Sequence, residues 1–252
     1  MLNHGINIDT VAQDIRPGIH HNGKPIIELS NVDKAYPTVT GPFFALKDIN
    51  ITIDPGEFVC IVGKSGAGKT TLINMITGVD SLSAGEVVVN GASIQSMNED
   101  RLALWRGRNL GVIYQTFELM PMLTLVENVM LPMDFCGLYR PRRSRERALE
   151  LLRLVELEDQ VDKLPSAISG GQQQRVAIAR ALANDPPIIV ADEPTGRLDS
   201  VTAETIFQFF EQLIYQGKTI LMVTHDRSAA ERSSRLLELV DGEIINQGLP
   251  EK

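Results

Sequence analysis

The sequence is poor in aromatic residues. Aromatic side chains make up 5% of its 252 residues, whereas hydrophobic residues as a group make up 43%. A core must therefore be built mainly from Val, Ile, Leu and Ala, a bias that favours buried parallel strands flanked by helices. The length fits one large domain, or a core with a smaller subdomain.

Cysteine is scarce as well. The two cysteines are Cys60, in the apolar run FVCIVG, and Cys136, which has no partner at metal-ligand spacing. Neither indicates a disulfide framework or a zinc site, so a reducing cytosol is the expected environment. We expect the adjacent His20 and His21 to be solvated loop residues rather than metal ligands.

A basic surplus and long apolar runs are missing too. The formal charge is 24 − 32 = −8, whereas a general nucleic-acid-binding protein usually carries a positive excess, so we expect no nucleic-acid partner. No apolar run approaches the roughly 20 residues that a membrane-spanning helix needs. The N-terminus lacks the apolar segment of a secretory signal. We expect residues 1–25, which are polar, to form a flexible arm or an adapter.

What is present is an alternation of β-branched runs and helical patterns. The runs that begin at Phe58 and Ile188 are almost wholly apolar, as central parallel strands are. The expected strands cover residues 25–30, 49–53, 57–63, 86–91, 110–115, 187–192, 218–225 and 235–245, the last with an Asp-Gly hairpin signal. The expected helices cover residues 69–77, 145–157, 169–185 and 200–217.

The middle of the chain differs from its flanks. It is helical in pattern, rich in Met and Leu, and interrupted by Pro121, Pro132, Pro141 and Pro165. We therefore expect a helical subdomain over residues 116–185, inserted into an α/β core formed by residues 26–115 and 186–249.

The segment IVGKSGAGKTT contains the pattern G-x-x-x-x-G-K-T between an expected strand and an expected helix. Glycines allow backbone amides to turn toward phosphate oxygens, and the helix N-terminus adds a positive dipole end. We expect Lys69 to reach the β- and γ-phosphates and Thr70 to bind Mg²⁺. The expected nucleotide-binding residues here are Gly63, Lys64, Ser65, Gly66, Ala67, Gly68, Lys69, Thr70 and Thr71.

Polar side chains follow three of the other expected strands. The strand PIIVAD runs into Asp192-Glu193 at the edge where parallel strands present their ligand crevice. Asp192 suits the Mg²⁺ shell, and Glu193 is then left to polarise a water in line with the γ-phosphate. His225 is expected to bind the γ-phosphate or orient that water. Gln115 can touch Mg²⁺ or water, or can simply end its strand.

Taken together, these residues resemble the ATP-binding-cassette (ABC) ATPases. The set comprises Gly63–Thr70, Gln115, SGGQ (169–172), Asp192-Glu193, LDS (198–200) and His225, and its order and spacing match from about residue 26 to 248. One such motif is weak evidence, whereas six in order are specific. The resemblance implies an α/β fold, a P-loop NTPase (RecA-like) core with an antiparallel β subdomain and an inserted α-helical subdomain. It also implies an ATPase that uses ATP and Mg²⁺.

The resemblance further implies a homodimer that sandwiches ATP between two copies of the chain. Ser169, Gly170, Gly171 and Gln172 would then face the γ-phosphate held by the partner copy, and Asp199 would lie in the dimer interface. A helix N-terminus with glycines and a hydroxyl is suited to an anion. Tyr36 resembles the aromatic residue that stacks on adenine, with an ordinary surface tyrosine before Pro37 as the alternative.

A finer resemblance rests on ALKDINITI, YQTFELMPMLTLVENVMLPM and VADEPTGRLD. These segments are similar to the lipoprotein-release and macrolide-export subgroup (MacB/LolD/FtsE type). It implies an ATPase subunit, peripheral at the cytoplasmic face of a bacterial inner or plasma membrane, that powers separate integral membrane permease subunits. The segment TFELMPMLTLVENVMLPM would receive a permease coupling helix, or else belong to the subdomain core.

Two other hypotheses accompany this one. A regulatory ATPase of the same subgroup would signal through a membrane partner to cell-envelope enzymes without moving a substrate. An ABC protein of DNA repair or translation is disfavoured, because the insert is short, one cassette is present and the chain is acidic. Arg197, Ile168 and Glu118 depart from the residues usual in the subgroup, yet none of these departures removes a catalytic group.

Overall fold

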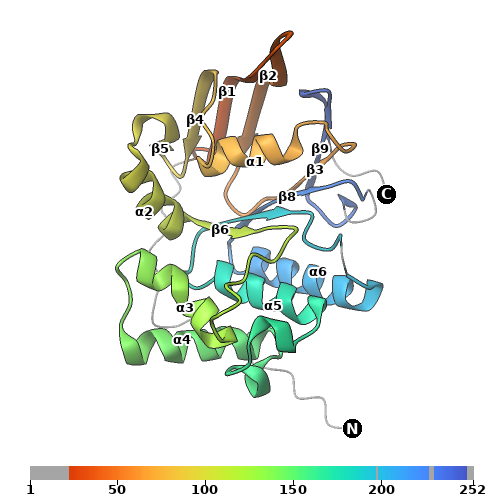
Figure 1. Ribbon diagram of the computed structural model, residues 1–252. Helices are drawn as coiled ribbons and strands as arrows, with labels where there is room; N and C mark the ends of the chain where they lie inside the picture. Colours follow the sequence, from red (N-terminus) through yellow and green to blue (C-terminus); the bar gives the residue numbers. More distant parts are fainter. Residues whose placement is uncertain (1–22, 197, 227–229, 249–252) are drawn as a thin grey trace.

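A computed structural model describes residues 23–196, 198–226 and 230–248 of the chain. Most of the predicted N-terminal arm, residues 1–22, therefore lies outside the described residues. Two β-sheets lie one above the other with α1 (Lys69–Thr77) between them, and a layer of helices covers the far side of the larger sheet (Figure 1). The mixed α/β fold predicted from the sequence is confirmed.

The larger sheet has six strands in the order β10-β9-β3-β8-β7-β6. β3 pairs in parallel with β8 and β9, and β7 pairs in parallel with β6 and β8. β9 and β10 form the antiparallel hairpin that Asp241-Gly242 predicted. The strands are β3 (Phe58–Val62), β6 (Leu110–Ile113), β7 (Ile188–Asp192), β8 (Thr219–Thr224), β9 (Arg235–Val240) and β10 (Glu243–Gly248).

The smaller sheet is antiparallel and has the order β2-β1-β4-β5. Its strands are β1 (Ile27–Thr38), β2 (Gly41–Ile53), β4 (Ala84–Val89) and β5 (Ala92–Ser93). β1 is longer than the predicted strand over 25–30, because shifts of register after Leu29, Val32 and Lys34 let the pairing with β2 continue. Tyr36 lies in this extended part of β1.

The side chains of β3 point alternately to the two faces of the larger sheet and contribute to a separate apolar cluster on each face. Val59 and Ile61 belong to a cluster formed with α1 and the smaller sheet. Phe58, Cys60 and Val62 belong to a second cluster, formed with the helical layer. Because successive side chains of a strand point to opposite faces, one wholly apolar strand serves both cores.

The helical layer contains α3 (Leu125–Phe135), α4 (Pro141–Leu154), α5 (Gly170–Ala181) and α6 (Ser200–Tyr215), while α2 (Glu99–Asn109) lies near β5 and β6 (Figure 1). Short 3-10 turns cover Ile94–Ser96, Glu158–Gln160 and Pro165–Ala167. α4 begins at Pro141, ahead of the predicted 145, since a proline fits the first turn of a helix. The sequence patterns did not predict α2.

α3, α4 and α5 lie together, within the range predicted for the helical subdomain, and share one apolar cluster with the larger sheet. The division into a core and an inserted subdomain stays a prediction. Over the described ranges, none of the helices combines the length and apolar character that crossing a membrane demands.

Candidate functional site

The loop between β3 and α1 is shaped to surround an anion. Gly66 and Gly68 have φ angles of 82° and 105°, which residues with a Cβ rarely adopt. A Cβ at Gly63 would lie 2.5 Å from the carbonyl oxygen of Leu239, so the close approach of these two segments requires glycine. Because the loop leads directly into α1, the positive end of the helix dipole adds to the field of the loop amides.

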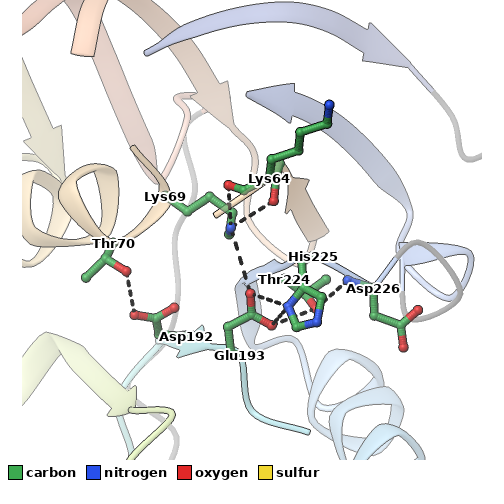
Figure 2. Close-up of polar contacts among 9 residues, drawn as sticks. Lys64, Lys69, Thr70, Asp192, Glu193, Thr224, His225 and Asp226 are labelled. Atoms are coloured by element: carbon green, nitrogen blue, oxygen red, sulfur yellow. Dashed lines mark hydrogen bonds and ion pairs between the residues drawn. The ribbon is translucent and has the colours of Figure 1, made fainter. Parts of the chain in front are cut away.

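Lys69 folds back over this loop (Figure 2). Its ammonium donates hydrogen bonds to the carbonyl oxygens of Gly63 (2.8 Å) and Lys64 (3.1 Å) and lies 3.8 Å from Oε1 of Glu193. The side chain is buried, so its charge acts in a medium that screens less than water does. A buried ammonium above a glycine-rich loop fits phosphate oxygens.

Thr70 and Asp192 bring two oxygen donors together at the end of β7. Thr70 Oγ1 donates a hydrogen bond to Oδ2 of Asp192 at 3.1 Å. Burial raises the pKa of Asp192, although the Thr70 hydroxyl opposes this. A hydroxyl and a carboxylate suit Mg²⁺, which commonly completes its shell with waters and substrate phosphates. Within the described ranges, no group of three or more His, Cys, Asp and Glu side chains gathers to hold a metal.

Glu193 and His225 meet beside this pair (Figure 2). Nδ1 of His225 lies 2.8 Å from Oε2 of Glu193, and Thr224 Oγ1 donates to the same oxygen at 3.1 Å. Glu193 has a φ of 47°, unusual for a residue other than glycine, and its amide donates to the Val223 carbonyl at 2.9 Å. The strained turn directs this carboxylate toward the loop and Lys69.

A cavity of about 560 Å³ connects these groups, a volume in the range of nucleotide-sized ligand sites. Two of its lining residues, Phe43 and Ala45, were not predicted from the sequence. The lining residues that were predicted are Tyr36, Ser65, Gly66, Gly68, Lys69, Thr70, Thr71, Gln115, Asp192, Glu193 and His225. Residues far apart in the chain therefore converge on one cavity.

Three residues of the predicted loop do not line the cavity. Gly63 and Lys64 instead present backbone carbonyls to Lys69, and the Lys64 side chain points away from the site (Figure 2). Ala67 is buried, and its carbonyl accepts a hydrogen bond from the Gly242 amide at 3.1 Å. These residues hold the shape of the loop.

The SGGQ segment opens α5 away from this cavity. Ser169 caps the helix by accepting a hydrogen bond from the Gln172 amide (3.3 Å), and the Gln172 side chain accepts one from the Ser169 amide (2.9 Å). A Cβ at Gly171 would lie 3.1 Å from the methyl group of Thr202, at the start of α6. None of the four SGGQ residues, 169–172, lines the cavity. Within one chain, the segment therefore contributes nothing to the cavity.

Asp199 caps α6, next to the SGGQ segment. Its Oδ1 accepts hydrogen bonds from the amides of Val201 and Thr202, and its Oδ2 accepts one from the Thr202 hydroxyl. The hydrogen bond from the Thr202 amide is the largest of the effects that lower the pKa of Asp199. Its place in a dimer interface stays a prediction, and Arg197 lies outside the described residues.

Sequence reasoning missed Arg180, which lies on α5. Its guanidinium donates hydrogen bonds to the carbonyls of Phe117 and Glu118, just after Gln115. Glu118 has a φ of 49°, so Arg180 stabilises a loop in an unfavourable conformation. The available signal was an arginine between alanines in an apolar helical pattern. Gln174, also on α5, is buried, and its side-chain amide has no hydrogen-bond partner among the described residues.

Comparisons with known proteins agree with this geometry. The sequence profile of the family described as "ABC transporter" matches residues 46–196. The ABC transporter ATP-binding protein MJ0796 of Methanocaldococcus jannaschii is 46% identical over 223 residues, covering 87% of this chain and 95% of that protein. The lipoprotein-releasing system ATP-binding protein LolD of Francisella tularensis is 43% identical over 220 residues, covering 87% and 95%.

A third relative is longer. The macrolide export ATP-binding/permease protein MacB of Bartonella henselae is 41% identical over 220 residues, which cover 87% of this chain and 33% of that protein. Among solved structures, MJ0796 as a post-hydrolysis dimer bound to ADP and Pi superposes with a TM-score of 0.84 at 43% identity, covering 90% of this chain and 99% of that one. This chain belongs to the ABC transporter family, as one of its ATP-hydrolysing ATP-binding cassettes.

Proposed function

We propose that this chain is the ATP-hydrolysing subunit of a membrane transporter, and that the cavity beside β3 and β7 is its ATP site. The observation that carries the proposal is the convergence of Lys69, Thr70, Asp192, Glu193 and His225 on one cavity from three separate strand ends (Figure 2). The loop amides and Lys69 bind the phosphates, and Thr70 with Asp192 holds Mg²⁺. When bound, Mg²⁺ offsets negative charge on the phosphate oxygens.

Glu193 acts as the proton acceptor for the attacking water. As the water oxygen bonds to the γ-phosphorus, the bond from that phosphorus to the bridging β–γ oxygen breaks and the water proton moves to Glu193. His225, in contact with the Glu193 carboxylate at 2.8 Å, positions the water and the γ-phosphate. Gln115, on the cavity wall where β6 leads into the helical layer, contacts Mg²⁺ or water.

The complete site needs a second copy of this chain. Ser169, Gly170, Gly171 and Gln172 of one copy face the γ-phosphate bound by the other, and Asp199 lies at the same interface. Two observations support this arrangement: α5 opens with its cap outside its own cavity, and MJ0796 was solved as a dimer. ATP then joins the two copies, and hydrolysis weakens the contact between them.

The partner driven by this dimer is an integral membrane permease on a separate chain, which places the cassette at the cytoplasmic face of the membrane. The similarity to the lipoprotein-releasing protein LolD and the macrolide export protein MacB supports lipoprotein or macrolide-type export. A second cavity, of about 360 Å³, lies where Phe117, Leu119 and Pro121 approach Pro165. Met120 and Met122 are exposed beside it, whereas Leu125, Val129 and Met133 are buried. We place the coupling socket on the Phe117–Met122 side of the predicted segment, whereas the buried residues of the remainder belong to the core.

Replacing Glu193 with Gln tests the site. The variant keeps the size of the side chain but removes the proton acceptor, so turnover should fall by about a thousandfold. ATP binding should persist, and size-exclusion chromatography with light scattering should detect an ATP-dependent dimer. Glu243→Gln, which alters an exposed carboxylate on β10, is the matched control and should hydrolyse ATP as the unaltered chain does. Near-normal turnover in Glu193→Gln would remove Glu193 from the proposed chemistry.

The transport assignment needs a separate experiment. The unaltered chain and the double variant Met120→Ser, Met122→Ser would be purified from native membranes under mild detergent. A permease should accompany the unaltered chain and be lost with the variant, while ATP hydrolysis by the isolated cassette stays unchanged. Recovery of a cell-envelope enzyme regulator with no substrate movement in reconstituted vesicles would favour the signalling hypothesis instead.

A further inference from the structure

The ring of Tyr36 lies on the cavity wall and is held from behind by two charged residues. Tyr36 Oη donates a hydrogen bond to Oδ2 of Asp80 at 2.9 Å. The ammonium of Lys34 lies 4.7 Å from the centroid of the Tyr36 ring. Neither Lys34 nor Asp80 lines the cavity, so the ring stands between the charged pair and the space where a ligand binds.

Lys34 is an unusual residue for this position. It lies on β1 and is only 7% exposed, whereas lysine is almost never buried without partners. Its ammonium donates to Oδ1 of Asp80 (2.7 Å) and to the Ser81 carbonyl (2.6 Å). The Tyr36 ring is its third neighbour. The buried Lys34 ammonium is thus stabilised by contacts that join β1 to the segment after α1.

Asp80 reaches Tyr36 because α1 ends sharply. Gly78 adopts a φ of 64° at the C-cap, and the amides of Val79 and Asp80 then bond back to the Asn74 carbonyl. This turn holds Asp80 beside the last turn of α1. Although burial opposes it, hydrogen bonds from Lys34 and Tyr36 hold the pKa of Asp80 below its usual value, so the carboxylate is ionised at neutral pH. The helix that begins at the phosphate loop thereby also fixes Tyr36.

Phe43 completes the wall. It is the direct cross-strand partner of Tyr36 in the pairing of β1 with β2, lines the same cavity and is 58% exposed. Directly opposed residues in an antiparallel pair lie on the same face of the sheet. Its neighbour Phe44 pairs with Ala35 and does not line the cavity. The two rings therefore present apolar surface on the wall of the cavity that the phosphate loop also lines.

We propose that Lys34 and Asp80 are positioning residues that hold Tyr36 as a platform for the base of the nucleotide, and that Phe43 provides a second contact for that base. The inference deepens the proposed ATP site and rests on it. The Tyr36–Asp80 hydrogen bond fixes the ring relative to α1, and therefore relative to the phosphates. An ammonium on one face of the ring withdraws electron density, which lessens repulsion between the negative faces of stacked π-systems. The ligand class is a purine nucleotide.

Comparison of ADP with inorganic pyrophosphate tests the platform, because pyrophosphate has the phosphates without the base. Calorimetry would measure both ligands on nucleotide-free protein. We expect Tyr36→Ala to weaken ADP binding about tenfold, and Asp80→Asn or Lys34→Met to weaken it about threefold. Phe43→Ala should weaken it about threefold, whereas Phe44→Ala, the matched control, should not. Pyrophosphate affinity should stay within about twofold of the unaltered value throughout.

Two further measurements separate positioning from a general structural role. For ATP hydrolysis, Asp80→Asn should raise KM and leave kcat unchanged. In the Tyr36→Ala background, Asp80→Asn should add no further loss of ADP affinity, because both changes act through one ring. Should either single charge variant prove unstable, the double variant Lys34→Met, Asp80→Asn removes both buried charges together and allows the same comparison.

Each failure has a distinct meaning. Unchanged ADP affinity in Tyr36→Ala would show that Tyr36 does not hold the base. Normal ADP affinity in Asp80→Asn and Lys34→Met, with a loss in Tyr36→Ala, would overturn the positioning role alone. Equal losses for ADP and pyrophosphate would make the charged pair merely structural. Failure to bind either ligand in the unaltered chain would instead overturn the proposed ATP site.

Discussion

His225 and Glu193 meet across two neighbouring strands, with Nδ1 of His225 2.8 Å from Oε2 and 2.9 Å from Oε1 of Glu193. The parallel register sets Asp192 on β7 opposite Val223 on β8. Both side chains therefore follow their strands at the same edge of the sheet. The imidazole is mostly exposed, whereas little of the carboxylate is exposed, so the histidine can position a water and a γ-phosphate that lie beside the carboxylate.

Replacing His225 with Ala should lower kcat for ATP hydrolysis by about a hundredfold, because the group that positions water and γ-phosphate is lost. KM for ATP should stay within about twofold, since the loop amides and Lys69 still bind the phosphates. Steady-state kinetics would measure both. Thr205→Ala, on the exposed side of α6, serves as control. A rise in KM with normal kcat would assign His225 to ground-state binding instead.

Thr70 offers a test of the Mg²⁺ site. Thr70→Val keeps the branched shape but removes the hydroxyl, so the Mg²⁺ concentration for half-maximal turnover should rise about tenfold. Thr70→Ser retains the hydroxyl and should titrate like the unaltered chain. Titration of turnover with Mg²⁺ at saturating ATP measures the shift. Identical Mg²⁺ curves for the Val and Ser variants would show that this hydroxyl is not a ligand.

Much of this site could be predicted because its signals are local. The apolar runs ending at Val62 and Asp192 place their following residues at one edge of the sheet. α1 covers residues 69–77, the range that the pattern predicted. The phosphate loop needs only its glycines and the flanking strand and helix.

The rest depends on contacts between distant segments. Tyr36 lies beyond the strand predicted over residues 25–30, because β1 changes register after Leu29, Val32 and Lys34, which breaks the period of two that identifies strands. Lys34 meets Asp80 across 46 positions of sequence. Arg180 contacts Phe117 across 63 positions. Pairings of this kind leave no periodic or spacing signal in one sequence.

Substitutions of Ser169 can separate its role as the N-cap of α5 from its proposed contact with the ATP bound by the partner copy. Aspartate is as good an N-cap as serine, so Ser169→Asp should preserve the helix while repelling the γ-phosphate of the other copy. In the Glu193→Gln background, it should abolish the ATP-dependent dimer without changing the ATP affinity of the monomer. Light scattering and monomer binding assays measure these effects separately.

The matched control is Ser169→Thr, because threonine keeps both the N-cap and the hydroxyl without adding charge. This variant should still dimerise with ATP. If Ser169→Asp instead weakened ATP binding by the monomer, the residue would belong to the site of its own chain, against its position outside that cavity.

The reactivity of the two cysteines can measure local opening of the fold at two places, β3 and the end of α3. Burial raises the pKa of Cys60 to about 12, with the negative charges of Glu193 and Asp226 adding to the effect. At pH 8 the thiolate fraction is then about one in ten thousand. Burial also raises the pKa of Cys136, at the end of α3. Iodoacetamide should therefore label neither thiol quickly in the folded chain and both in guanidinium.

Adding ATP with Mg²⁺ should slow the labelling of Cys60 further, because β3 carries the phosphate loop and ligand binding makes its opening rarer. Cys136 ends a helix in the other layer, so local fraying there should expose it first and its rate should respond less to the nucleotide. Mass spectrometry of separate peptides would follow both rates, with Cys136→Ser confirming the assignment. Faster labelling of Cys60 than of Cys136 would contradict the burial of β3 beneath the ATP site.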